Sequence, residues 1–210
     1  MANDAARFWN PRFSAEGYAY GTQPNDFVRE CASRLSGTRR VLCIGDGEGR
    51  NGVYLASLGH RVTSLDASAA GLQKARRLAL ERGVELETRL LDLWGHSLAT
   101  EKWDAIVSVF CHLPSELRRR VHGDVAAALN PGGVFVLEAY TPAQLRFRTG
   151  GPKDPELLYT VEELRGELSG LTLDLCREVE REVVEGKLHS GRAAVVQILA
   201  INDRRPPTSR

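Results

Sequence analysis

The sequence has no long apolar run, and this absence argues against a membrane-spanning protein. No stretch of the 210 residues approaches the ~20 apolar residues needed to cross a bilayer. The start of the chain, Met1 to Asp4, is not a basic segment followed by an apolar one, so we expect no secretory signal. We therefore expect a cytoplasmic protein without membrane contacts, folded as a single domain over residues 1–202 with a disordered tail at 203–210.

An excess of charge of one sign is also missing. Lysine and arginine number 28 and aspartate and glutamate 27, which gives a formal net charge of +1. Proteins that hold a phosphate backbone by general electrostatics carry a clear basic excess. We predict no nucleic-acid partner, a small-molecule substrate, and a monomer or weak dimer.

Clustered metal ligands are absent from the sequence as well. The cysteines are few and widely spaced, without a C-x-x-C pair, and the five histidines are equally scattered. Zinc sites need thiolates or imidazoles at close spacing, so we expect no metal and reduced, buried thiols. The four cysteines are Cys31, Cys43, Cys111 and Cys176.

What the sequence does contain is an alternation of strand and helix patterns. Short apolar runs that end at glycine or aspartate indicate buried parallel strands, and the segments between them have helical spacing. The predicted helices cover 51–58, 69–81 and 114–129, and a further short helix follows Thr160, which forms a capping box with Glu163. The predicted strands cover residues 40–44, 60–65, 84–91, 103–110, 134–140, 171–184 and 187–201.

This order predicts an α/β fold. We expect a doubly wound, mostly parallel seven-stranded sheet of the Rossmann-like type, closed by an antiparallel C-terminal strand. The first 37 residues would form a helical extension that acts as a lid within the same domain.

A glycine-rich turn marks the candidate ligand site. Gly45, Gly47 and Gly49 follow the first strand directly and precede a helix, where glycine allows a tight turn and close approach of a ligand to the backbone. Asp66 ends the second strand, where a carboxylate can bind both hydroxyls of a ribose. The pair indicates an adenosine-type ligand.

Two cofactors carry such a nucleoside. The dinucleotide pattern G-x-G-x-x-G fails from Gly45, because position 50 is arginine. Asp46 and Glu48 would also place two carboxylates beside a pyrophosphate, which is repulsive. S-adenosylmethionine instead carries an amino group and a sulfonium, so electrostatics favours it over NAD.

A larger set of motifs resembles the class I S-adenosylmethionine-dependent methyltransferases, and more narrowly the small bacterial methyltransferases of the tellurite-resistance type. The narrower resemblance rests on residues 13–27 together with Gly49-Arg50-Asn51. The wider one rests on the glycine turn, Asp66, Leu91-Asp92-Leu93, the strand Trp103 to Ser108, and Asn130-Pro131-Gly132-Gly133.

The resemblance assigns roles to particular residues. Gly45, Gly47 and Gly49 would make room for the ribose and methionine portions of S-adenosylmethionine, and Asp66 would bind the ribose. The remaining members of the implied cofactor site are Ala67, Asp92 and Leu93 beside the adenine, and Phe110 near the methionine portion and the acceptor.

One position departs from the family pattern. An acid is usual near the end of the first strand, and here that residue is Cys43. We expect Asp46, or failing that Glu48, to reach the amino group of the cofactor instead.

Methyl transfer proceeds by in-line displacement, so alignment and exclusion of water supply much of the acceleration. A general base is needed only for a protonated acceptor. His112, after the fourth strand, is the candidate base, and the alternative is a loop histidine bonded to the backbone. In the N-terminal segment, Tyr18 and Tyr20 either close over the cofactor and acceptor or pack on the edge of the sheet.

These observations predict methyl transfer from S-adenosylmethionine to a small-molecule acceptor, without a metal. Two alternatives stay open. One is a non-catalytic regulator that binds S-adenosylmethionine, consistent with Cys43. The other is a nicotinamide-dependent oxidoreductase, which the glycine spacing and the acidic turn disfavour.

Overall fold

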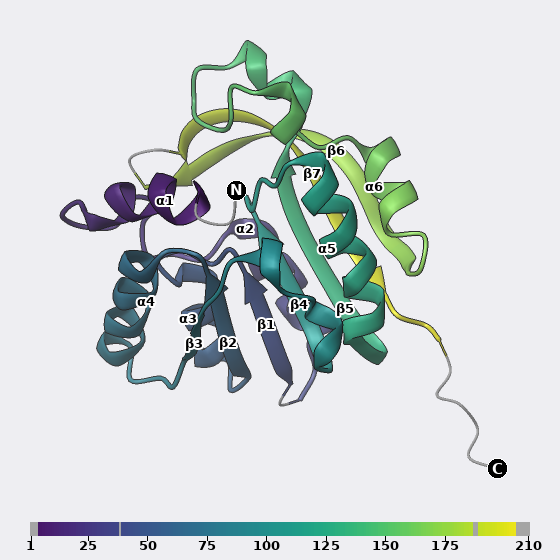
Figure 1. Cartoon of the computed structure of the whole chain (residues 1–210), viewed down its shortest axis with the longest axis horizontal. Coiled ribbons are helices and arrows are strands. Elements are labelled where there is room, and N and C mark those ends of the chain that lie inside the picture. The colour runs from purple at the N-terminus through teal and green to yellow at the C-terminus, as the bar shows by residue number, and fades with distance from the viewer. Residues whose placement is uncertain (1–3, 38, 187–188, 205–210) are drawn as a thin grey trace.

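The computed structural model describes residues 4–37, 39–186 and 189–204. Its centre is a seven-stranded sheet of order β3-β2-β1-β4-β5-β7-β6, in which β1 to β5 pair in parallel and β7 is antiparallel to both of its neighbours, β5 and β6 (Figure 1). The predicted α/β fold is therefore confirmed. The strands are β1 (Arg40–Ile44), β2 (Arg61–Asp66), β3 (Glu87–Leu90), β4 (Trp103–Val109), β5 (Leu129–Tyr140), β6 (Thr172–Glu185) and β7 (His189–Ile201).

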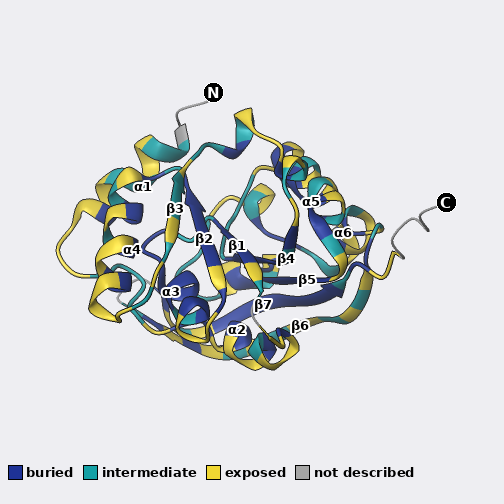
Figure 2. Ribbon diagram, turned by 90° about the horizontal axis from the view of Figure 1, so that it is seen from below, coloured by how far each residue is buried: buried dark blue, intermediate teal, exposed yellow. Residues whose placement is uncertain are grey.

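Helices cover both faces of the sheet because alternate strand residues point to opposite sides. On one face Leu42 and Ile106 pack with α5 and α6, and on the other Val41 and Val107 pack with α2 and α3. The strands in the middle of the sheet are accordingly buried (Figure 2). The helices are α1 (Asp4–Ser14), α2 (Asp26–Cys31), α3 (Arg50–Ser57), α4 (Ala69–Glu81), α5 (Ser115–Ala128) and α6 (Val161–Glu167).

Two strands begin three or more residues away from the predicted start. β3 starts at Glu87 rather than residue 84, because Val84 and Leu86 pack against Val53 and its neighbours on α3 and α4 instead of pairing with β2. β5 starts at Leu129 rather than residue 134, because Leu129 already pairs with β4 through a register shift.

The ends of the chain and the helix lengths complete the comparison. Of the predicted tail, residues 205–210 lie outside the described range, as do residues 187–188 of the last predicted strand. Within the described part of the chain, no helix has the length and apolar composition to span a membrane.

The N-terminal helix is held on the start of α4. Ser68 caps α4 by accepting from Gly71 N at 3.0 Å, as a serine before a helix should. Asn10 of α1 accepts from the Ser68 hydroxyl at 2.7 Å and from Ala70 N at 3.2 Å. These contacts place α1 above the carboxyl ends of β2 and β3 (Figure 1).

A buried ionic network joins the second helix to the C-terminal half of the sheet. Glu138 of β5 is fully buried and accepts from Asn25, Arg181 and Gln197 at 2.5–2.7 Å. Asn25 is also the N-cap of α2, where its side chain accepts from Val28 N. Removing one partner of such a buried ion pair typically costs about 3 kcal/mol or more. The network therefore fixes α2 against β5, β6 and β7.

Inside the glycine turn lies a second buried carboxylate. Asp46 accepts hydrogen bonds from the Ser64 hydroxyl of β2 and from the Gly52 amide in the first turn of α3. Burial raises the pKa of Asp46 to about 7, more than these two hydrogen bonds lower it.

This pKa predicts an unusual dependence of stability on pH. The folded protein holds a proton on Asp46 that the unfolded chain releases, so the contribution is complete below the unfolded pKa of 3.8 and is lost as pH rises through about 7. From about pH 5 to about pH 8 the wild type should lose about 2 kcal/mol of unfolding free energy through this group. Asp46→Asn, which does not ionise, should lose correspondingly less.

Urea unfolding at intervals across that pH range measures the difference. Glu85→Gln removes an exposed carboxylate at the other end of the sheet and serves as the control. Parallel pH profiles for the wild type and Asp46→Asn would contradict the assignment.

Candidate functional site

The predicted ligand residues come together at one edge of the sheet. The glycine turn follows β1, Asp66 ends β2, Asp92 follows β3 and Phe110 follows β4. Parallel strands bring their carboxyl ends to the same edge, which is where open α/β sheets bind ligands.

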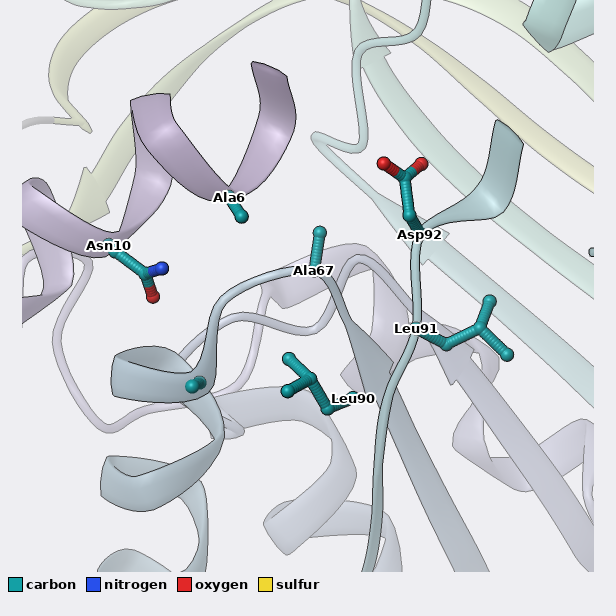
Figure 3. Close-up of a pocket in the computed structure, with 7 residues that line it drawn as sticks. Ala6, Asn10, Ala67, Leu90, Leu91 and Asp92 are labelled. Carbon is teal, nitrogen blue, oxygen red and sulfur yellow. The ribbon is translucent and has the colours of Figure 1, made fainter. Parts of the chain in front are cut away.

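A cavity of about 230 Å³ opens at this edge, between α1 and the ends of β2 and β3. Alanine and leucine side chains alternate with polar groups in its walls, the Asp92 carboxylate lies at the side, and α1 faces Ala67 and Asp92 across it (Figure 3). Ala67 and Asp92 were expected here from the sequence. The residues that line the cavity are Ala6, Asn10, Ala67, Ala69, Leu90, Leu91 and Asp92.

The Asp66 carboxylate joins the glycine turn to the start of α4. One oxygen accepts from Gly47 N at 2.8 Å and the other from Ser68 N at 2.7 Å. Burial raises the pKa of this carboxyl, while the backbone donors lower it. The Ala67 amide also donates to this carboxylate, and because each oxygen has two lone pairs, Asp66 can still accept a further hydrogen bond beside Ala67.

Asp92 and Leu93 differ in what they present to the cavity. Asp92 caps the short turn Leu93–Gly95 by accepting from Trp94 N at 2.9 Å. The Leu93 side chain is buried in the main core, packed among residues of β4, α5 and β5. Only the backbone of Leu93 can therefore border a ligand at this edge.

The glycine turn is tightly packed by other parts of the protein. Gly45, Gly47 and Gly49 have φ of +60°, +56° and +85°, which side-chain-bearing residues rarely adopt. A Cβ at Gly45 would lie 2.5 Å from Cys111 Sγ, and one at Gly47 would lie 2.9 Å from the Phe13 ring. The role of these glycines in admitting a cofactor stays a prediction, because protein neighbours alone already require them.

The structure corrects the role that the sequence predicted for Asp46. We expected its carboxylate to reach the amino group of the cofactor, but it is held between Ser64 and the first turn of α3. An acid at this place in the turn follows the backbone inward, because Gly52 leaves room for it.

Glu48 is likewise committed to contacts within the protein. Its carboxylate accepts from Ala19 N at 2.7 Å and from Lys74 of α4 at 2.8 Å. It therefore fixes residues 15–24, which we call the N-terminal arm, to the glycine turn.

The two tyrosines of the N-terminal arm lie in different places. Tyr18 packs with Val53 and Leu78, near Lys74 and Arg77 of α4, so the expectation that it closes over the cofactor is wrong. Tyr20 instead points to the site edge, with its ring centroid 4.5 Å from that of His189. The arm bends and turns between the two residues instead of running extended, so the two side chains point to different sides.

Phe110 carries backbone strain at the end of β4. Its φ of +51° is the only positive value among the described residues other than glycine, and such strain typically costs about 1–3 kcal/mol. The ring stacks on Tyr140 at 4.5 Å between centroids and lies edge to face with His189 at 4.9 Å.

His112 shows the backbone contact that the alternative interpretation predicted. Its Nδ1 lies 2.7 Å from the carbonyl oxygen of Leu157. A carbonyl only accepts, so the proton is on Nδ1 and Nε2 carries a free lone pair. Burial lowers the pKa of His112 to about 4, with smaller contributions from His189 and Arg118.

Tyr140 and His189 are site residues that the sequence interpretation missed. They come from the end of β5 and the start of β7, and reach the same edge only because β7 runs antiparallel to β5. The predicted hairpin was the available signal, since it implied that the start of the last strand lies beside the end of the fifth.

Comparison with known proteins finds methyltransferases similar to this chain. Residues 41–133 match the family model described as a methyltransferase domain. The ubiquinone biosynthesis O-methyltransferase of Bordetella avium is 33% identical over 135 residues, which is 61% of this chain and 54% of that protein. The tRNA 5-carboxymethoxyuridine methyltransferase of Escherichia coli is 29% identical over 104 residues, 48% of this chain and 40% of that protein. The chain thus spans about half the length of the curated relatives it matches.

Solved structures share the fold over nearly the whole chain. A structure from work on conversion of a disulfide bond into a thioacetal group in echinomycin biosynthesis has a TM-score of 0.75 at 19% identity, covering 97% of this chain and 94% of its own. TehB from Haemophilus influenzae gives 0.69 at 20%, covering 94% and 66%. N-methyltransferase NodS from Bradyrhizobium japonicum, in complex with S-adenosyl-L-homocysteine, gives 0.70 at 18%, covering 95% and 99%.

At these identities the structural likeness establishes the fold. The family model matches the sequence of residues 41–133, which include the glycine turn, Asp66 and Asp92. Residues 41–133 match a methyltransferase domain, and the chain is similar in sequence to S-adenosylmethionine-dependent methyltransferases and shares their fold.

Proposed function

We propose that this protein transfers the methyl group of S-adenosylmethionine to a small-molecule acceptor by in-line displacement. The observation that carries the proposal is the cavity between α1 and the ends of β2 and β3, with the Asp92 carboxylate at its side and Asp66 next to Ala67 in the chain. The alanine and leucine side chains suit a flat base, and the carboxylates suit an exocyclic amine and ribose hydroxyls.

Each cofactor contact follows from what its residue presents. Asp66 accepts from the ribose hydroxyls with its free lone pairs, and Asp92 accepts from the adenine amine. Ala67 borders the adenine by its side chain and Leu93 by its backbone. The methionine portion would extend along Gly45, Gly47 and Gly49 toward Phe110 and Tyr20, which lie past the ends of β1 and β4.

The chemistry assigned to this chain is alignment and removal of one proton. S-adenosylmethionine supplies the methyl group: its carbon–sulfur bond breaks with the electron pair staying on sulfur, and a bond forms to the acceptor heteroatom. His112 Nε2 takes the acceptor's proton, because its lone pair is fixed by the Nδ1 contact with Leu157. The aromatic rings around Phe110 exclude water from this place.

Balanced charge supports a small acceptor. The formal net charge is +1, whereas tRNA binding draws on a basic surface. The relationship to a tRNA methyltransferase makes RNA the competing acceptor. Cys43 is buried in the core at the position where the family resemblance leads us to expect an acid, and this keeps the non-catalytic regulator as the competing function.

The first prediction concerns acceptor type. Incubation with S-adenosylmethionine carrying a labelled methyl group, together with either a metabolite extract or total RNA, should transfer label to a low-mass compound. Chromatography separates the products. Label in RNA alone would contradict a small acceptor, and cofactor binding without any transfer would support the regulator.

The second prediction concerns Asp66. Asp66→Ala should weaken S-adenosylmethionine binding by about 10- to 100-fold, since hydrogen bonds to a charged group contribute about 1.5–3 kcal/mol. Isothermal titration calorimetry measures the affinity and thermal unfolding confirms that the variant is folded. Glu85→Ala, which removes an exposed carboxylate before β3, is the control. Unchanged affinity in Asp66→Ala would show that the ribose assignment is wrong.

The third prediction concerns His112. His112→Gln retains an N–H donor for Leu157 but no base, so turnover should fall by about 100-fold or more while cofactor affinity stays the same. Because the imidazole is neutral well above a pKa of about 4, its ionisation should not limit turnover between about pH 6 and about pH 8.

Labelled-methyl transfer measures the His112 effect, with His60→Gln at the opposite edge of the sheet as the control. An equal loss of cofactor affinity and turnover would point to a structural role for His112.

A further inference from the structure

The side chain of Asn10 on α1 has a fixed orientation at the wall of the cavity. Its Oδ1 accepts from the Ser68 hydroxyl at 2.7 Å and from the Ala70 amide at 3.2 Å. A backbone amide only donates, so the contact with Ala70 settles which end of the Asn10 amide is oxygen and which is nitrogen. Figure 3 shows the oxygen turned toward α4 and the nitrogen turned toward Ala67, inside the cavity.

The two ends of this amide differ in what they have left to offer. Both lone pairs of Asn10 Oδ1 are occupied by the contacts with α4, whereas neither N–H of Nδ2 has a hydrogen-bond partner among the residues that the structure describes. The acceptor end therefore holds the side chain in place, and the donor end is available to a ligand. A ligand that binds a side chain held in this way does not have to order it first.

The cavity presents few polar side chains to its occupant. Of the seven residues that line it, Asn10 and Asp92 have polar side chains, and the others are alanine or leucine. An ionised carboxylate only accepts, and this holds for Asp92 and for Asp66 beside the cavity. Within the described part of the chain, Asn10 Nδ2 is thus the one side-chain donor in the lining.

An adenosine cofactor needs partners of both kinds. Its exocyclic amine and its ribose hydroxyls can donate to carboxylates, but the unsubstituted ring nitrogens of adenine only accept. The ring nitrogen N3 lies across the six-membered ring from the carbon that carries the amine, and on the edge of the base nearest the ribose. A donor that binds N3 must therefore lie opposite the partner of the amine and close to the partner of the ribose.

Asn10 lies in this position. It faces Asp92 from the other side of the cavity (Figure 3). Its oxygen accepts from Ser68, and the Ser68 amide donates to Asp66 at 2.7 Å. An adenine with its amine at Asp92 and its ribose at Asp66 consequently turns N3 toward Asn10.

From these contacts we propose that Asn10 binds the adenine of the cofactor, with Nδ2 donating to the purine nitrogen N3. The inference rests on the proposed function, because it takes S-adenosylmethionine as the occupant of this cavity. Asp66 and Asn10, which Ser68 joins by hydrogen bonds, then bind the ribose and the base from one side. Asp92 binds the amine from the other.

The assignment makes α1 a part of the cofactor site. The helix also has an anchor that is independent of Asn10, because the buried ring of Phe13 fills the space beside Gly47 and Gly71 that a Cβ would occupy. Substitution of Asn10 should accordingly leave α1 in place and change the contact with the base.

Cofactor analogues test the assignment of N3. S-(3-deazaadenosyl)-L-homocysteine carries a C–H in place of N3, and the 7-deaza analogue carries one in place of N7. In isothermal titration calorimetry the wild type should bind S-adenosyl-L-homocysteine about tenfold more tightly than the 3-deaza analogue, as expected for the loss of one hydrogen bond. Asn10→Asp keeps oxygen acceptors for Ser68 and Ala70 but has no N–H, so it should bind these two ligands with equal affinity.

Gln73→Glu makes the same change from amide to carboxylate at an exposed position of α4 and is the matched control. It should retain the wild-type preference for S-adenosyl-L-homocysteine over the 3-deaza analogue. The preference for S-adenosyl-L-homocysteine over the 7-deaza analogue should be the same in the wild type and in Asn10→Asp. If thermal unfolding shows that Asn10→Asp is not folded, Asn10→Leu supports the same comparison, because each variant is judged by the ratio of its two affinities.

Equal affinity of the wild type for S-adenosyl-L-homocysteine and the 3-deaza analogue would overturn the proposal. So would a preference that persists in the Asn10 variants, or an effect of Asn10 confined to the 7-deaza analogue, which would assign it to a different ring nitrogen. Absence of S-adenosyl-L-homocysteine binding to the wild type contradicts the proposed function and this proposal with it. Binding of S-adenosyl-L-homocysteine that does not depend on N3 contradicts only the role of Asn10.

Discussion

The pair of hydrogen bonds that the Asp66 carboxylate accepts from the amides of Gly47 and Ser68 is the contact on which the rest of the site depends. One carboxylate joins the turn after β1 to the start of α4, and Ser68 in turn holds Asn10 of α1. The glycine turn and α1 are thus connected through the side chains of Asp66 and Ser68, although Asn10 and Ser68 are 58 residues apart in the sequence. A charged acceptor between two backbone donors is also well suited to hold such a turn, since charge-assisted hydrogen bonds are stronger than neutral ones.

Much of the parallel half of the fold could be predicted from local pattern. β1, α4 and the capping box of α6 lie where strand patterning, cap residues and glycines placed them. The glycine turn and Asp66 could be placed at one edge because parallel strands share a direction. Places where the prediction was wrong follow from packing that local pattern does not contain: Val84 and Leu86 prefer the helix layer, and Leu129 joins the sheet through a register shift.

The candidate site was harder to predict where residues meet over long separations. Asn10 on α1, Tyr140 and His189 reach the edge only through tertiary packing, and none carries a sequence signal of its own. For Asp46 and Tyr18, residue type and spacing predicted the region of the structure but not the direction of the side chain. That direction depends on the space that Gly52 leaves for Asp46 and on the packing of Tyr18 against Val53 and Leu78.

Glu48 and Arg50 flank Gly49, and each holds a different segment of the chain: Glu48 the N-terminal arm and Arg50 the end of β6. Glu48 binds the amide of Ala19, while Arg50 binds Glu185 just before the hairpin that leads into β7. The minimal autonomous unit is consequently larger than the nucleotide-binding half of the chain. A fragment beginning at β1 would bury Glu48 without its partner in the arm and Glu138 without its partner at the start of α2. A fragment ending before β6 would leave Arg50 without its ion-pair partner Glu185. Recombination that exchanges substrate-recognition segments between relatives would therefore have to carry the arm and the terminal hairpin together.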